Sequence, residues 1–167
     1  EALFAGGGDL PLRPVGMHAM DVLRLEKGYR HWGHDIGDED TPLQAGLGFA
    51  VGWKKAGDFI GRRALEKQKA AGVTRRLLAF QLEDPEVLLY HNEPIWRDGR
   101  LVGRTTSGNY GHTLGSAIAL GYVPVAAGSP PSAALDGTYE IEVAWQRFAV
   151  KASLAPLWDP KGERLKG

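Results

Sequence analysis

From Arg76 onward, apolar side chains recur at every second position, which is the spacing of half-buried β-strands. The alternation is clearest around Leu78, Phe80 and Leu82. Asp98-Gly99 is the strongest short-range hairpin signal in the chain and joins two of the expected strands. The expected strands are 76–83, 93–96, 101–107, 116–123, 137–144 and 147–154, and a turn at Trp145-Gln146 joins the last two. Six short strands separated by turn signals predict a small antiparallel barrel or sandwich.

The residues before position 73 follow a different pattern. Met17, Met20 and Leu23 fall at helical spacing, so a helix is expected from about residue 16 to residue 26, with Gly28 as its stop. The apolar run Leu43–Trp53 predicts a strand, and Phe59–Ala71 predicts a second helix that Gly72 ends. The chain therefore divides near residue 73 into a mixed α and β part and a β part.

Composition excludes several classes of protein. Lys plus Arg and Asp plus Glu are 20 each, and this zero net charge argues against a dedicated nucleic-acid binder or a polybasic membrane anchor. The absence of cysteine excludes disulfides, cysteine-based zinc sites and a cysteine nucleophile. No apolar run approaches the roughly 20 residues of a membrane span. The start EALFAGGG does not have the pattern of a signal peptide, and we expect the chain to be a fragment of a longer protein.

The turn that follows residue 30 offers two metal-site hypotheses, each beside an ordinary alternative. His31 and His34 have the spacing of a metal half-site on a helix, but the nearby Gly33 and Gly37 favour a polar loop. The acidic residues at positions 35 and 38–40 resemble a calcium loop only in their charge, so a solvated turn is the expected reading. No nucleophile signature accompanies them.

Three aromatic side chains, Trp32, Phe49 and Trp53, lie close together in the sequence beside several glycines. They are candidates for the wall of a site for a flat heterocycle, although aromatic side chains at such positions more often belong to the core.

The segment from Asp21 to Trp53 resembles the central segment of the glycine-cleavage aminomethyltransferase family. The chain is similar to that family over about residues 10–160. The matching motifs are Leu-Arg-x-Glu-x-Gly at 23–28, Gly-x-Asp-Ile at 33–36, Thr-Pro at 41–42, Gly-x-x-Thr-Ser-Gly at 103–108 and Ala-x-Gly-Tyr-Val at 119–123.

Within the family, the runs at 26–36 and 44–51 are most similar to the C-terminal, folate-binding half of dimethylglycine and sarcosine dehydrogenases. The resemblance implies a larger enzyme whose N-terminal domain holds FAD. There the flavin oxidises an N-methylamine to an iminium, and tetrahydrofolate captures the one-carbon unit as 5,10-methylenetetrahydrofolate. The FAD domain and the upstream carboxylate that assists folate lie outside this chain, so we expect the chain alone to be inactive.

The resemblance also implies the architecture. We expect an α+β fold in which a partial mixed α/β folate-binding domain with a linker helix, residues 1–72, precedes a small six-stranded antiparallel Greek-key β-barrel, residues 73–167.

Two residues are expected to contact tetrahydrofolate. Phe49 occupies the position at which the family places an aromatic ring against the pterin. Arg76 matches a basic residue near the folate tail and is expected to pair with a glutamyl carboxylate, although Arg75 is an alternative for this role and Arg76 facing solvent is another. Met20 stands where aminomethyltransferases have an arginine that contacts folate, which favours the dehydrogenase branch. No catalytic residue and no metal site are expected here, and Arg24 with Glu26 is expected to form a structural ion pair.

Two other functions stay open. A stand-alone aminomethyltransferase of the glycine cleavage system would act with an aminomethyl-lipoyl carrier protein, and a non-catalytic module would use folate for regulation or repair. The expected partners are folate, an amine substrate such as dimethylglycine or sarcosine, and the upstream FAD and folate domains, but no nucleic acid and no membrane. We expect residues 1–60 to expose apolar surface and promote self-association, and we expect a cytoplasmic location.

Overall fold

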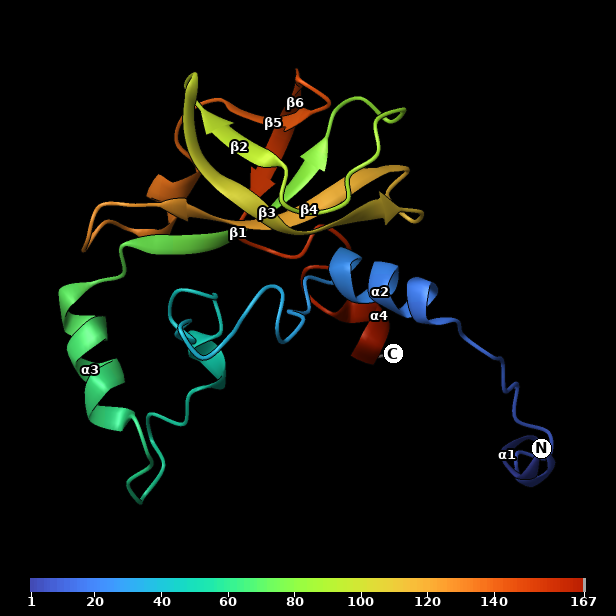
Figure 1. The fold of residues 1–167 in the computed structure, drawn as a ribbon. Helices are drawn as coiled ribbons and strands as arrows, with labels where there is room; N and C mark the ends of the chain where they lie inside the picture. Colours follow the sequence, from blue (N-terminus) through green and yellow to red (C-terminus); the bar gives the residue numbers. More distant parts are fainter. Residues whose placement is uncertain (167) are drawn as a thin grey trace.

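The computed structural model describes residues 1–166 and places the sheet in the second half of the chain (Figure 1). The helical elements are α1 (Ala2–Gly6), α2 (Met17–Glu26), η1 (Gly48–Ala50), α3 (Arg62–Ala71), η2 (Pro131–Leu135) and α4 (Glu163–Lys166). The strands are β1 (Arg75–Leu82), β2 (Pro94–Arg97), β3 (Arg100–Gly111), β4 (Ser116–Pro124), β5 (Tyr139–Val143) and β6 (Gln146–Ser153). In the part of the chain that is described, no helix is long and apolar enough to cross a membrane.

The six strands close into a barrel in the order β1-β4-β3-β2-β5-β6, and every neighbouring pair is antiparallel. Strands β2, β3 and β4 follow one another as a meander, and β1 lies beside β4, which is a Greek-key arrangement. The expectation of an α+β chain with a six-stranded antiparallel Greek-key barrel is confirmed. Closure of the sheet pairs both edges of every strand, so the barrel has no open edge.

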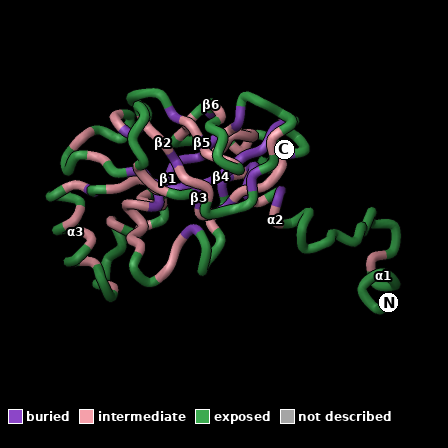
Figure 2. The backbone as a smooth tube through the Cα atoms, turned by 45° about the horizontal axis from the view of Figure 1, so that its top comes forward, coloured by how far each residue is buried: buried purple, intermediate pink, exposed green. Residues whose placement is uncertain are grey.

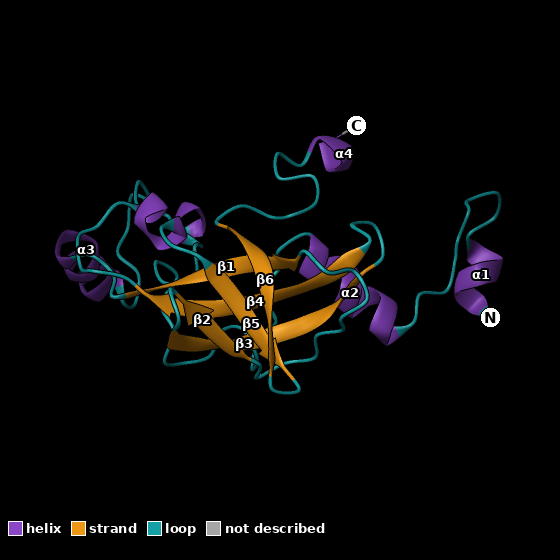
Figure 3. Ribbon diagram, turned by 90° about the horizontal axis from the view of Figure 1, so that it is seen from above, coloured by secondary structure: helices purple, strands orange, loops and turns teal. Residues whose placement is uncertain are grey.

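Strand β1 is buried on both of its faces. Leu78, Phe80 and Leu82 belong to the cluster of apolar side chains inside the barrel, whereas Leu77 and Ala79 belong to a second cluster on the outside. Leu25 of α2 joins that outer cluster and is 2% exposed. Figure 2 shows the buried stretches concentrated in the barrel and reaching α2. The helix therefore covers one outer face of the barrel, where it contacts β3 and β4, and Figure 3 shows it beside the strands.

Two tight turns connect paired strands. Asp98 and Gly99 both have positive φ and join β2 to β3, as the hairpin signal predicted. The last turn lies one residue earlier than expected, because Val143 pairs with Gln146 and the turn residues are Ala144 and Trp145. Both of these have positive φ, which is unusual for residues with side chains, and the Trp145 side chain is 94% exposed.

Strand β3 is longer than expected and continues to Gly111 instead of ending at Ser107. The extension includes Gly108, where an added Cβ would lie 2.5 Å from the carbonyl oxygen of Tyr90. A glycine at this position allows the loop before β2 to approach the strand backbone closely. The glycines made this strand look shorter in the sequence than it is in the structure.

The prediction of a strand at Leu43–Trp53 is wrong. This run forms successive turns and the short helix η1, with the amide of Ala45 donating to the carbonyl of Thr41 and that of Leu47 donating to Pro42. An isolated apolar run needs a partner strand to become a strand, and the closed barrel offers it no free edge. The helix expected at 59–71 is present but begins at Arg62.

The first 16 residues extend away from the barrel, with α1 at their far end (Figures 1 and 3). Their side chains and those of the outer face of α2 are largely exposed, as Figure 2 also shows. The exposed apolar side chains here are Leu3, Phe4, Leu10, Leu12, Val15, Met17, Met20 and Leu23. The expected exposure of apolar surface in the first part of the chain is therefore present.

Candidate functional site

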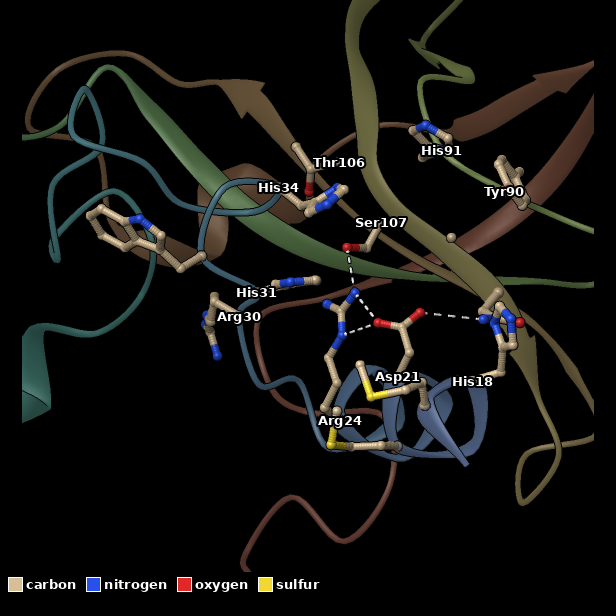
Figure 4. Close-up of a pocket in the computed structure, with 15 residues that line it drawn as sticks. His18, Asp21, Arg24, Arg30, His31, His34, Tyr90, His91, Thr106 and Ser107 are labelled. Carbon is tan, nitrogen blue, oxygen red and sulfur yellow. Dashed lines mark hydrogen bonds and ion pairs between the residues drawn. The ribbon is translucent and has the colours of Figure 1, made fainter. Parts of the chain in front are cut away.

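A pocket of about 560 Å³ lies where α2 meets strand β3 (Figure 4). Its floor and walls come from four segments: α2, the loop that follows α2, the loop before β2, and the middle of β3. Its polar lining includes carboxylate, guanidinium, imidazole, hydroxyl and amide groups, and its apolar lining is Met17, Met20 and Trp32. This mixture of an apolar wall with a few convergent polar groups is typical of a small-molecule site.

Arg24 is the centre of the polar network. Its Nε donates to Asp21 Oδ1 over 2.8 Å, its Nη1 donates to Asp35 Oδ2 over 2.6 Å, and its Nη2 donates to Ser107 Oγ over 2.9 Å. Residues three apart on a helix share a face, so the helix itself places Asp21 beside Arg24. The expected ion pair of Arg24 with Glu26 is wrong, because residues two apart on a helix point in different directions.

Asp35 fastens the loop after α2 to the barrel. Its carboxylate is fully buried and accepts hydrogen bonds from Arg24, from the His31 amide at 2.8 Å and from Thr106 Oγ1 at 2.6 Å. A buried carboxylate requires such partners because desolvation penalises its charge. These bonds position His31 and Arg24 at the pocket.

Glu26 forms its hydrogen bonds on the side of α2 that faces away from the pocket. Its carboxylate is buried and accepts hydrogen bonds from the amide and the hydroxyl of Thr113, each at 2.7 Å. Its carbonyl accepts from the Trp158 amide at 3.1 Å. Glu26 thus attaches the helix to the turn between β3 and β4 and does not line the pocket.

The environment shifts the pKa values of two charged groups at the pocket, Asp21 and Arg30. Burial raises the pKa of Asp21, but the hydrogen bond and the charge of Arg24 outweigh it, so the pKa lies below the ordinary value. Burial lowers the pKa of the Arg30 guanidinium, which Asp35 partly offsets. Arg30 donates from Nε to the Ala45 carbonyl at 3.0 Å. A guanidinium stays protonated in proteins, so Arg30 remains a cation.

The histidines of the loop lie at the pocket, with the rings of His31 and His34 4.5 Å apart between centroids. Within residues 1–166, no group of three or more His, Asp or Glu side chains is arranged to hold a metal ion. In the acidic turn, Asp40 accepts from the Gly37 amide at 2.8 Å and pairs with Arg75 at 2.7 Å. That carboxylate therefore stabilises the turn and the start of β1.

Neither of the two residues expected to contact folate lines the pocket. Phe49 lies on η1, its side chain is 85% exposed, and it does not line the pocket. Arg76 lies in β1 opposite Val123, and its buried Nε has no hydrogen-bond partner among the described residues. Of the three aromatics considered as a wall, only Trp32 lines the pocket, while Trp53 donates to the Gly48 carbonyl at 3.1 Å. Met20 does line the pocket.

Sequence reasoning missed the contributions of His18, His91 and Ser107 to the pocket. The spacing of Asp21 and Arg24 was a signal for a polar face on α2. No local signal connects that face to the residues at 91 and 107, because the barrel topology alone brings them together.

Comparison with known proteins agrees with the fold. The profile of the Glycine cleavage T-protein C-terminal barrel domain matches residues 75–159, and that of the GCVT N-terminal domain matches residues 1–55. A 4-methylaminobutanoate oxidase (formaldehyde-forming) of Paenarthrobacter nicotinovorans is 44% identical over 167 residues, covering 100% of this chain and 20% of the oxidase. Mitochondrial sarcosine dehydrogenase of Homo sapiens is 40% identical over 171 residues, covering 100% of this chain and 18% of the dehydrogenase.

Among solved structures, the glycine cleavage system aminomethyltransferase T of Bartonella henselae superposes with a TM-score of 0.79 at 25% identity. The match covers 95% of this chain and 44% of that protein. The chain spans about a fifth of the length of the oxidase and the dehydrogenase. It belongs to the glycine cleavage T-protein family, on the branch that includes the dimethylglycine and sarcosine dehydrogenases.

Proposed function

We propose that this chain is the tetrahydrofolate-binding portion of an enzyme that demethylates an N-methylamine. The amine is a secondary or tertiary amino acid of the dimethylglycine or sarcosine kind, and the products are the demethylated amine and 5,10-methylenetetrahydrofolate. FAD belongs to the N-terminal domain of the whole protein. Residues 1–72 act as the C-terminal part of the folate domain, and residues 73–167 act as the barrel domain.

The pocket between α2 and β3 is the observation that supports this proposal most directly. Its volume of about 560 Å³ lies within the range of roughly 300–1,000 Å³ that small-molecule sites have. Met20 and Trp32 offer apolar surface for a flat ring. Within residues 1–166, Asp21 Oδ2 accepts only a long 3.4 Å contact from Asn109, so it has capacity to accept a hydrogen bond from a ring N–H or amino group.

The chain's own residues position and hold the ligand in this scheme. Arg24 is fixed by Asp21, Asp35 and Ser107, so it orients the Asp21 carboxylate toward the pocket. Bound tetrahydrofolate would supply the nitrogen atoms that receive the one-carbon unit. The flavin and the assisting carboxylate are proposed to lie upstream in the whole protein, so the chain alone is proposed to be inactive.

Phe49 and Arg76, which do not line the pocket, are an alternative pair of folate contacts that the family resemblance implies. The exposed ring of Phe49 is free to stack on a pterin in the whole protein. The unpartnered Nε of Arg76 is a donor that a glutamyl carboxylate would satisfy.

A stand-alone aminomethyltransferase is the second candidate, and the structural match to such an enzyme favours it. It would act on an aminomethyl-lipoyl carrier protein. Met20, in place of the arginine expected in that branch, favours the demethylating enzyme. Sequencing upstream of residue 1 separates the two candidates, because only the demethylating enzyme would encode an FAD domain.

The folate function is tested by calorimetric titration of tetrahydrofolate into the 167-residue chain and into the whole protein. Asp21→Asn removes an acceptor charge in the pocket and should weaken binding about tenfold, the effect of losing one hydrogen bond to a charged group. Asp9→Asn, an exposed substitution far from the barrel, is the matched control and should bind as the parent does. Equal affinity for both variants would contradict the assignment of the pocket.

A further inference from the structure

The histidines of this chain are concentrated at one place. Of its five histidines, four line the pocket: His18, His31, His34 and His91. They come from three separate segments, namely α2, the loop after it and the loop before β2. Figure 4 shows them on different sides of the Asp21–Arg24 pair. All four are exposed, so their rings are accessible from the pocket opening.

The other charges at the pocket balance one another. The cations Arg24 and Arg30 face the carboxylates of Asp21 and Asp35, and Arg24 forms ion pairs with both acids. The remaining ionisable group at the lining is the phenol of Tyr90, whose ring lies 4.7 Å from that of His91. The protonation of the histidines therefore decides whether the pocket is neutral or cationic.

Building on the folate-binding function proposed above, we infer that this pocket holds the carboxylate of its ligand against the four histidines, and holds it more tightly as pH falls from about 7.5 to about 5.5. A carboxylate in this pathway has two sources, which are the glutamyl tail of a folate and the carboxylate of the N-methylamino acid. Both present the same chemistry to an imidazolium.

The direction of the pH dependence follows from the groups that titrate. Imidazole is the side-chain type whose charge changes between about pH 5 and pH 8, whereas aliphatic carboxylates are ionised throughout that interval. Asp21 stays negative as well, because Arg24 holds its pKa below the ordinary value. Binding of the anion must then be coupled to uptake of protons, and affinity rises as pH falls.

The size of the effect is set by solvent screening. An exposed ion pair changes a binding constant by about two- to threefold. Two or three protonated histidines in reach of one carboxylate therefore predict about a tenfold tightening over the interval.

The experiment titrates two probes into the 167-residue chain by calorimetry at both pH values and at constant ionic strength. The first probe is p-aminobenzoyl-L-glutamate, which has the carboxylates of a folate but no pterin. The second is N-methylglycine. Tightening of the first identifies the folate tail as the source, and tightening of the second identifies the amine substrate. Titration in two buffers of different ionisation enthalpy counts the protons taken up.

The variant His31→Gln/His34→Gln should lose most of the tightening at acidic pH. His112→Gln is the matched control, because it changes the histidine that does not line the pocket. Thermal unfolding of each variant checks that the fold is retained. Sulfate, titrated in parallel, should bind far more weakly than the organic probes.

Several results would overturn the inference. These are pH-independent binding of both probes, an unchanged pH response in the double variant, and a sulfate response equal to that of the probes. If neither probe tightens at acidic pH but tetrahydrofolate binds, the inference fails and the folate function stands. If the probes tighten at acidic pH but tetrahydrofolate does not bind, the folate function fails and the histidine site stands.

Discussion

Replacing Asp35 by alanine should destabilise the chain more than any other single change at the pocket. The carboxylate is fully buried and joins three parts of the molecule: the helix through Arg24, its own loop through the His31 amide, and the barrel through Thr106. Its loss leaves donors without their acceptor in the protein interior.

The magnitude can be worked from those three bonds. Removing one partner of a buried ion pair costs about 3–5 kcal/mol when the other charge is left uncompensated. Arg24 keeps Asp21 and Ser107, so the lower end of that range applies, about 3 kcal/mol. For a protein of this size, each kcal/mol shifts the unfolding midpoint by about 2–4 °C, which predicts a fall of about 6–12 °C.

The assay is thermal unfolding followed by circular dichroism, with Asp84→Ala as the control. Asp84 is an exposed acid whose carboxylate accepts only from the nearby Glu86 amide, so its loss should change stability by less than about 0.5 kcal/mol. Thr106→Val and the double variant complete a cycle in which Asp35 and Thr106 should couple by about 1 kcal/mol. A midpoint within about 2 °C of the parent for Asp35→Ala would refute the reasoning.

Four further outcomes are expected. Phe49→Ala should weaken tetrahydrofolate binding by the whole protein but leave the melting temperature of the chain unchanged, because the ring is 85% exposed; unchanged affinity in calorimetry counts against stacking. The isolated chain should not demethylate N-methylglycine, and formaldehyde or methylenetetrahydrofolate detected by mass spectrometry would disprove this. Exposed apolar residues near the N-terminus should make the chain self-associate in light scattering, and a monodisperse monomer at high concentration would argue otherwise. Asp21 has a lowered pKa in the folded state, so its contribution to stability is present above its ordinary value near 3.8 and is lost as pH falls through the folded pKa; urea unfolding of Asp21→Asn should differ from the parent at neutral pH and converge with it in strong acid.

The barrel was predictable because its signal is local. Alternation of Leu78, Phe80 and Leu82 with their neighbours, together with the Asp98-Gly99 turn, depends only on residues that are close in sequence. The run Leu43–Trp53 has similar apolar content but no strand to pair with, and pairing is a property of the whole fold. Intrinsic preference for a strand was therefore overridden by topology.

The pocket was not predictable, because the topology of the whole fold brings its residues together. Arg24 and Ser107 are 83 residues apart, and Asp21 and Asn109 are 88 apart. Motif spacing identified the helix end and the turn, but it contained no information on which barrel strand would face them. Phe49 was selected by resemblance, and in the structure its ring is exposed and does not line the pocket.

The burial of both faces of β1 has a consequence for where the chain can be cut. Leu77, Ala79 and Ile118 lie on the outside of the barrel and are covered in part by Leu25 of α2. An expression fragment that starts near residue 73 would expose these apolar side chains to solvent. It would also lose the two hydrogen bonds from Thr113 to Glu26. The change of sequence pattern near residue 73 is therefore not a suitable truncation site. A stable truncated protein would have to retain α2 together with the barrel.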